Sequence, residues 1–364
     1  MPPPQSGEPL RIVLPAHRVT PFDPWRVYAE RVGDRQVIYL DNNAWIDLRD
    51  EKTAEARKCL RLCQQGVGGG RAIFPVSYAS VSELLEMTED ASRISQADLM
   101  DALSLGVTFR TAEIVHHLEG EDVYRFFLDG SIQSGRRREV FTELPDYFGD
   151  GHVSIPEGWH ADDVAAYLAH YRSTAGSLRW MIEHIDCDQV AKNHARANDY
   201  GKLLDERRVA HRGHLGVAVV DREVLAHEER VAMVNSFVLP AIRRIGLPDG
   251  DPMKVALKLV ELQEKLHGED NRRTFRRAFR AAGPGLEMLV QIFARQSREV
   301  NRKTTRRDFW DIEHASLGTV YADVFVSADG YLNEVLRLGN RRPTAARAQM
   351  LSSIRELTTW LERL

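Results

Sequence analysis

The sequence predicts an α/β fold, a doubly wound parallel sheet that a large helical segment interrupts. Strand-like and helix-like segments alternate over residues 36–95, which is the order of parallel βαβ units. From about residue 96 to residue 299 the pattern is almost wholly helical. Strand character then returns in "ADVFVSADGYL". We therefore expect residues 36–95 and 300–340 to form one domain, split by an insertion.

The first predicted elements are an arm, a strand and two helices. Residues 1–35 begin with the polar, Pro-rich "MPPPQSGEPL", which predicts an extended arm. The apolar run "QVIYL" predicts a strand, and "NAWIDLRD" and "TAEARKCLRLCQQ" predict helical segments that stop at "GVGGG". This glycine run precedes a strand and lacks the Lys and Ser/Thr of a phosphate-binding loop, so we interpret it as a plain loop.

The next elements repeat this order before the insertion begins. "RAIFPVS" predicts a second strand, and "YASVSELLEM" predicts a helix whose Val81, Leu84 and Leu85 share one face. Residues 96–299 are predicted to be an all-helical insertion, with "DVAAYLAHYRSTAGSLRWMIEHI" and "DPMKVALKLVELQEKLH" as amphipathic helices. After the insertion, "RRDFWDIEHASLGTVY" predicts the helix before the last strand.

The last predicted element is an amphipathic helix in residues 341–364. One stripe of this helix is apolar and comprises Met350, Ile354, Leu357, Leu361 and Leu364. The helix should dock either onto its own chain or onto a protein partner, including a second copy of the chain.

Composition limits the compartment and the partners. A chain of 364 residues with 43% hydrophobic residues is typical of folded proteins, and a net charge of -4 leaves only local patches for binding nucleic acid. The three cysteines are too few for a disulfide framework, which indicates a reducing, cytoplasmic location, with Cys59 and Cys63 as buried thiols. No apolar run approaches the roughly 20 residues of a membrane span.

Four carboxylates follow or flank the predicted strands at comparable positions. Asp41 follows the first strand, Glu83 lies in the helix after the second, and Asp311 and Asp329 flank the last one. Side chains at the carboxyl ends of parallel strands converge on one crevice, where such folds bind ligands. Carboxylates that meet there repel one another unless a cation neutralises them. Without a His/Cys cluster, Mg²⁺ or Mn²⁺ fits this donor set better than Zn²⁺.

Each acid also has an ordinary structural interpretation. Asp41 and Asp311 are of the residue type that caps helices, and Glu86 is an alternative to Glu83. Asp308 and Glu313 would face solvent or pair with neighbouring arginines. His314 is interpreted as a packed or hydrogen-bonded histidine instead of a base, and "IVHHLEGED" as a solvated helix end.

The order of these acids resembles the PIN-domain (PilT N-terminal-like) nucleases. The resemblance lies in "YLDNNAWIDL", "PVSYASVSELLEM" and "DFWDIEHASLGTVYADVFVSAD", and it covers residues 36–95 and 300–336. It implies that Asp41, Glu83, Asp311 and Asp329 hold Mg²⁺ or Mn²⁺, with Asn42, Asn43 and Ser327 in support. The family usually has Thr or Ser at the position of Asn42.

The implied activity is that of a metal-dependent endoribonuclease that cuts single-stranded RNA with a metal-activated water, leaving 5′-phosphate and 3′-hydroxyl ends. The alternative is a decayed PIN-like module that binds RNA or protein without cutting. A phosphatase with an Asp nucleophile is disfavoured, because Asn43 stands where a second Asp is expected.

Two basic runs are candidates for binding the RNA substrate. "RRTFRRAFRAAG" places Arg273, Arg276 and Arg277 among two phenylalanines, and "RKTTRRDFW" brings Arg306 and Arg307 close to the acids. Arginines beside aromatic rings can hold phosphates and stack unpaired bases. The alternative is a solvated helix face with the phenylalanines in the core.

Overall fold

The structure is a computed structural model. It describes residues 27–130, 136–144, 177–184, 202, 205–206, 222–240, 271–298, 305–336 and 347–364. The expected arm up to residue 26 and the expected helix over residues 251–267 lie outside these residues, as does most of the expected helix over residues 163–185.

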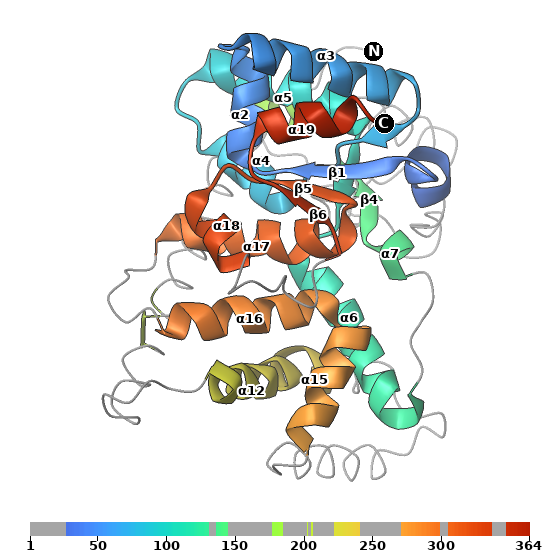
Figure 1. The fold of residues 1–364 in the computed structure, drawn as a ribbon, viewed down its shortest axis with the longest axis vertical. Helices are drawn as coiled ribbons and strands as arrows, with labels where there is room; N and C mark the ends of the chain where they lie inside the picture. Colours follow the sequence, from blue (N-terminus) through green and yellow to red (C-terminus); the bar gives the residue numbers. More distant parts are fainter. Residues whose placement is uncertain are drawn as a thin grey trace, which may run out of the picture.

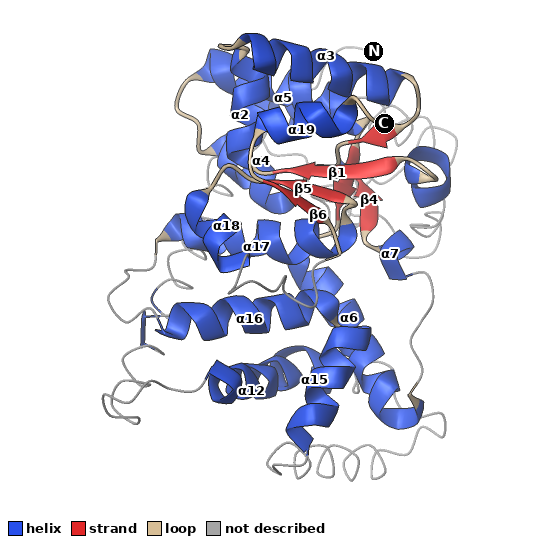
Figure 2. Cartoon of the chain, in the orientation of Figure 1, coloured by secondary structure: helices blue, strands red, loops and turns tan. Residues whose placement is uncertain are grey.

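A four-stranded parallel sheet forms the centre of the α/β part (Figure 2). Its order is β2 (Ala72–Ile73), β1 (Gln36–Leu40), β5 (Val324–Val326) and β6 (Gln349–Leu351). The register places Leu40 beside Val326, and Val326 beside Leu351. The carboxyl ends of β1, β5 and β6 therefore meet at one edge of the sheet. The sequence predicts this for β1 and β5, whereas β6 is an addition.

Both faces of the sheet are buried, which explains why its strands are continuous apolar runs. In β1, Ile38 and Leu40 point into one core, whereas Val37 and Tyr39 point into the other. The helices that contribute to the first core are α2 (Asn42–Asp50), α3 (Ala54–Gly68), α4 (Tyr78–Leu85), α5 (Asp90–Ser104), α10 (Leu178–His184) and α19 (Ile354–Leu361). The prediction of an α/β fold is confirmed.

The second core continues into stacked helical layers. Its helices are α6 (Ala112–Asp129), α12 (Arg222–Met233), η2 (Val234–Val238), α15 (Asn271–Ala282), α16 (Pro284–Arg298), α17 (Arg306–Tyr321) and α18 (Gly330–Leu336). Helix α17 packs on the sheet, α16 packs on α17, and α12 and α15 pack on α16 (Figure 1). Among the described helices, those of the second core thus lie on one face of the sheet, whereas α10 packs on α5 in the first core.

The insertion is not all-helical, contrary to the prediction. Strands β3 (Val107–Phe109) and β4 (Phe141–Glu143) pair antiparallel, with the short helix α7 (Arg136–Glu139) before β4. A parallel bridge between Val76 and Thr108 joins this pair to the segment after β2. Residues 96–110 therefore extend the α/β part instead of opening the insertion. Each of these strands has only three residues, too few to show a period of two.

Both ends of the described chain also differ from the prediction. Tyr28–Val32 form the π-helix η1 where an extended arm was expected. Met350 lies in the added strand β6, so the helix begins only at Ile354. The apolar side of α19 packs on α3 of the same chain, with Leu357 fully buried. The stripe therefore docks onto its own chain and is not free for a partner.

Gly318 on α17 allows the close approach of this helix to the sheet. A Cβ at Gly318 would overlap the ring of Tyr39 and would lie 2.7 Å from Cδ2 of Phe325. We expect Gly318→Ala to lower the free energy of unfolding by about 1–3 kcal/mol, the usual range for overpacking. Gly68→Ala is the matched control, because nothing lies within 4 Å of a Cβ there. Denaturant unfolding measures both changes, and equal values for the two variants would contradict this packing account.

Candidate active site

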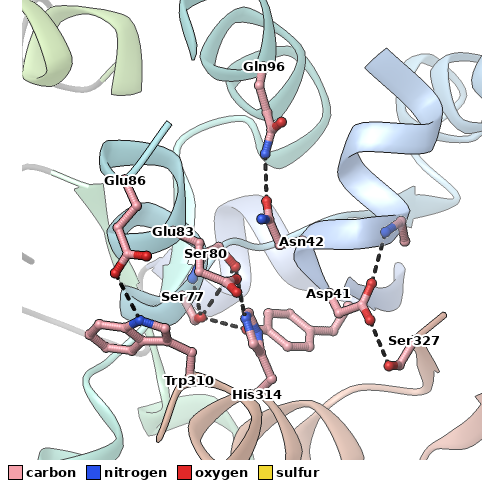
Figure 3. A network of polar contacts seen from close by, with 12 residues as sticks. Asp41, Asn42, Ser77, Ser80, Glu83, Glu86, Gln96, Trp310, His314 and Ser327 are labelled. Carbon is pink, nitrogen blue, oxygen red and sulfur yellow. Dashed lines mark hydrogen bonds and ion pairs between the residues drawn. The ribbon is translucent and has the colours of Figure 1, made fainter. Parts of the chain in front are cut away.

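Asp41 lies directly after β1 and is held from two sides. Its Oδ1 accepts a hydrogen bond from the backbone nitrogen of Ala44 at 2.8 Å, so Asp41 is the N-cap of α2. Its Oδ2 accepts the hydroxyl of Ser327 at 2.6 Å, and Ser327 follows the neighbouring strand β5. The capping interpretation is therefore confirmed, and the same carboxylate also faces the carboxyl edge of the sheet (Figure 3).

Glu83 reaches the same region from α4 and contacts His314 of α17. Oε2 of Glu83 lies 2.8 Å from Nε2 of His314, whose Nδ1 lies 2.6 Å from the hydroxyl of Tyr39. Burial, the largest single effect, lowers the pKa of His314, but the charge of Glu83, its hydrogen bond to His314 and the charges of Asp41 and Asp311 together raise the pKa above its ordinary value. The expected hydrogen-bonded histidine is confirmed. Glu86 points away and accepts the indole N–H of Trp310, which favours Glu83 over Glu86.

Asp311 and Asp329, the other two predicted acids, lie on α17 and directly before α18. Asp311 lies in the second turn of α17, and burial together with the charge of Asp329 raises its pKa to about 8. Asp329 caps the first turn of α18, since its Oδ1 accepts the backbone nitrogen of Leu332 at 2.6 Å. Its own backbone nitrogen donates to the hydroxyl of Ser327, which links Asp329 to Asp41.

Mutual repulsion couples the four carboxylates. The pKa of Asp41 is raised, first by burial and further by the charge of Glu83, although hydrogen bonds from Ser327 and Ala44 oppose this. The charge of Glu83 also raises the pKa of Asp311. The charge of Glu83 thus disfavours the ionised forms of Asp41 and Asp311, and the charge of Asp329 disfavours that of Asp311. A hard cation would relieve this repulsion.

We next ask whether these side chains already form a metal-binding site in the structure. In the part of the chain that the structure describes, no three His, Cys, Asp or Glu side chains are grouped closely enough to hold a metal ion. Glu83 instead contacts His314, with Oε2 2.8 Å from Nε2. The chemistry of the donors fits Mg²⁺ or Mn²⁺, and the residues that would hold the ion are Asp41, Glu83, Asp311 and Asp329.

The two asparagines after Asp41 differ in their surroundings. Oδ1 of Asn42 accepts a hydrogen bond of 2.8 Å from Nε2 of Gln96 on α5, whereas Asn43 is exposed on the first turn of α2. Gln96 is fully buried, and its Oε1 in turn accepts from Arg49 at 3.2 Å. Asn42, the residue after Asp41, is therefore the last member of an ordered chain of hydrogen bonds that begins at Arg49.

The basic run on α15 does not lie near the acids. Helices α16 and α17 separate α15 from the tips of the strands (Figure 1). Arg273 and Arg277 are exposed and Arg276 is half-buried, but Phe275 and Phe279 are buried in the core. The two phenylalanines are thus not available to stack bases, and that part of the prediction is wrong.

The second basic run is closer to the acids. Arg307 is exposed on the first turn of α17, one turn before Asp311. Arg306 is the first residue of the same helix. Among the predicted cations, these two are therefore the nearest along the chain to the carboxylates.

Three polar residues are buried, whereas solvent exposure was expected for His116 and either solvent exposure or pairing with arginines for Asp308 and Glu313. Asp308 forms a capping box with Thr305 at the start of α17, so this helix opens before Asp311 and Asp311 is not its cap. Glu313 is buried, and burial raises its pKa to about 7. His116 is also buried, against Phe237, and burial lowers its pKa to about 3, so "IVHHLEGED" is not a solvated helix end.

Tyr39 and Gln96 are part of the site, although sequence reasoning did not identify either of them. Tyr39 shares the face of β1 that leads to Asp41. Its hydroxyl also contacts the hydroxyls of Ser77 and Ser80 at the start of α4. The signal that could have identified Tyr39 is its hydroxyl, which lies on an inward-facing strand residue two positions before Asp41.

Comparison with protein-family models, with curated proteins and with solved structures gives no match. Among the described helices, none combines the length and apolar character that crossing a membrane requires. The function must therefore be argued from the site itself.

Proposed function

We propose that this protein is a metal-dependent phosphodiesterase of the PIN type, an endoribonuclease for single-stranded RNA. The observation that carries the proposal is the electrostatic coupling of Asp41, Glu83, Asp311 and Asp329 at the carboxyl edge of a parallel sheet. These acids come from three separate segments of the chain and occur in the order that PIN nucleases share. Helix capping explains Asp41 and Asp329, and the contact with His314 accounts for Glu83, but neither explains the buried Asp311.

The roles of the residues follow from their contacts. When bound, Mg²⁺ or Mn²⁺ would polarise the phosphate and lower the pKa of an attacking water. Ser327 holds Asp41 in place through Oδ2, and the caps at Asp41 and Asp329 fix both carboxylates to the ends of rigid helices. His314 holds Glu83, and Tyr39 holds His314. Such partners orient ligand side chains and tune their affinity for metal.

The alternative is a PIN-like module that binds RNA or protein without cutting. Its support is the contact between His314 and Glu83, which satisfies that carboxylate without a metal. The two functions predict different responses to Mn²⁺. A nuclease should gain thermal stability as Mn²⁺ is added, because binding to the folded state alone stabilises it. A binding module should show no such rise.

The direct test is cleavage by the purified protein. Single-stranded RNA, structured RNA and single-stranded DNA are incubated separately with Mn²⁺, with Mg²⁺ or with a chelator. We expect cuts in unpaired RNA that require the metal. If all three substrates remain intact under every condition, the nuclease proposal fails.

The arginines of α15 should contribute to RNA binding but not to metal binding. Replacing Arg273, Arg276 and Arg277 with Ala should weaken RNA binding equally for all sequences. It should also reduce the slope of log affinity against log salt by about 0.7 for each lost phosphate contact. Metal binding should persist, because α15 lies away from the acids (Figure 1). Fluorescence anisotropy at several salt concentrations measures the slope.

The variant Asp329→Asn should have the opposite phenotype to the arginine variant. Its amide can still cap α18. It should abolish turnover while RNA binding persists or tightens, since a ligand and a repulsive charge are removed together. If the triple arginine variant binds RNA with unchanged affinity and unchanged salt dependence, the arginines of α15 contact only solvent or protein and not RNA. The RNA would then have to approach by Arg306 and Arg307.

A further inference from the structure

Two hydrogen bonds, from Arg49 to Gln96 and from Gln96 to Asn42, orient the amide of Asn42. Donor and acceptor cannot be exchanged in either of them. Arginine can only donate hydrogen bonds, so the atom of Gln96 that faces Arg49 must be its oxygen. The amide nitrogen of Gln96 then faces Asn42 and donates to Oδ1 at 2.8 Å. The carbonyl oxygen of Asn42 therefore faces Gln96, and the NH₂ group of Asn42 points away from Gln96.

The first two members of this chain are immobilised, so the direction is preserved. Arg49 is held by Asp50 through Nε and Nη2, at 2.7 Å and 2.5 Å, and its side chain is only 12% exposed. Gln96 is completely buried, so neither end of its amide can turn to solvent. A reversed Gln96 would place its NH₂ group against the guanidinium, with two donors facing each other.

The free end of Asn42 faces the carboxylates. Figure 3 shows Asn42 between Gln96 on one side and Glu83 and Asp41 on the other. Among the described residues, no hydrogen bond takes the Nδ2 hydrogens of Asn42. A reversed Asn42 would set its oxygen against these acids, which is repulsive. Both ends of the chain therefore favour the same orientation.

We infer that Asn42 donates its Nδ2 hydrogens to a non-bridging oxygen of the substrate phosphate, and that Gln96 and Arg49 are its positioning residues. This inference rests on the proposed function. A phosphodiester oxygen accepts hydrogen bonds and carries negative charge, so a fixed N–H donor is a suitable partner in a site otherwise lined by acids. PIN nucleases usually have the hydroxyl of Thr or Ser at this position. Asn42 would provide an N–H donor there, held in one orientation by Gln96.

The variant that tests the direction is Gln96→Glu. The new carboxylate still accepts from Arg49, but it cannot donate to Asn42, so the amide of Asn42 turns and presents its oxygen to the site. We expect KM for single-stranded RNA to rise about ten- to a hundredfold, the loss of one hydrogen bond to a charged group, with a smaller change in kcat. The affinity for Mn²⁺ should be unchanged. A merely structural role would lower stability and metal affinity together.

Two further variants keep the test decisive. Asn42→Asp removes the donor directly and still accepts from Gln96, so it should raise KM even if Gln96→Glu folds poorly. Gln64→Glu makes the same chemical change on the exposed surface of α3 and should change nothing. A second probe is inorganic phosphate, whose ³¹P signal is broadened when it binds beside Mn²⁺. Both site variants should reduce this broadening.

The outcomes separate this inference from the nuclease proposal. Cleavage of RNA with an unchanged KM in Gln96→Glu and Asn42→Asp would overturn the role of Asn42 and leave the nuclease. Phosphate binding that depends on Asn42, in a protein that cuts no nucleic acid, would support the donor and overturn the nuclease. A wild-type protein that neither cuts nor binds phosphate would overturn both.

Discussion

Asp41→Asn should reduce metal-dependent RNA cleavage on the order of 10³-fold, comparable with losses seen on removing a central catalytic group. The fold should persist, because an asparagine can keep the cap on Ala44, and Ser327 can accept from its amide nitrogen. The stabilisation by Mn²⁺ should weaken in parallel, since one carboxylate ligand is lost. The measurements are cleavage rates and melting temperature over a Mn²⁺ titration.

Asp47→Asn is the matched control for this change. Asp47 lies on the same helix α2 but is exposed to solvent, so the charge change is equal and the site is untouched. It should cleave RNA at the wild-type rate. If Asp41→Asn were as active as Asp47→Asn, Asp41 would be a helix cap and nothing more.

Glu287→Leu should lower the free energy of unfolding by about 3–5 kcal/mol, the usual loss when one partner of a buried ion pair is removed. Glu287 on α16 binds Arg230 on α12 through two hydrogen bonds of 2.9 Å and 2.7 Å, and the side chains are 0% and 1% exposed. Without Glu287, the guanidinium would be buried between helices with its charge uncompensated. Chemical denaturation in the presence of a chelator measures the loss without a contribution from metal.

The double variant Arg230→Met with Glu287→Leu distinguishes this explanation from simple loss of packing. An apolar pair of similar volume often restores or exceeds the original stability, so most of the loss should be recovered. Glu334→Gln, in the exposed pair with Arg295, should change stability by less than about 1 kcal/mol. A double variant as unstable as the single one would show that the charge is not the cause.

The parts of the fold that the sequence predicted are those with strong local signals. A strand buried on both faces is a continuous apolar run, so β1 was visible in "QVIYL", and the acid after it was visible for the same reason. Strands β3, β4 and β6 were missed because their sequences, VTF, FTE and QML, each contain a polar residue and so lack the continuous apolar run of β5. Each is defined by pairing with another segment of the chain. The pairing of Gln349 with Val324 has no local trace.

The same reason explains what was missed in the site. Each of the four acids stands beside a recognisable strand or helix, so their order could be read from the sequence. The groups that position them are contacts across the fold: Tyr39 meets His314 over 275 positions, and Asn42 meets Gln96 over 54. Such partners follow from packing, which local pattern does not specify.

The measurement that tests the central claim most directly is the mapping of cleavage sites on total cellular RNA, treated with wild-type protein or with Asp41→Asn in the presence of Mg²⁺ or Mn²⁺. We expect the wild-type protein to create discrete new 5′-phosphate ends in unpaired regions, and these ends to be absent with the variant and with chelator. New ends that appear equally with Asp41→Asn, or no new ends with the wild-type protein, would contradict the assignment of these carboxylates to a nuclease site.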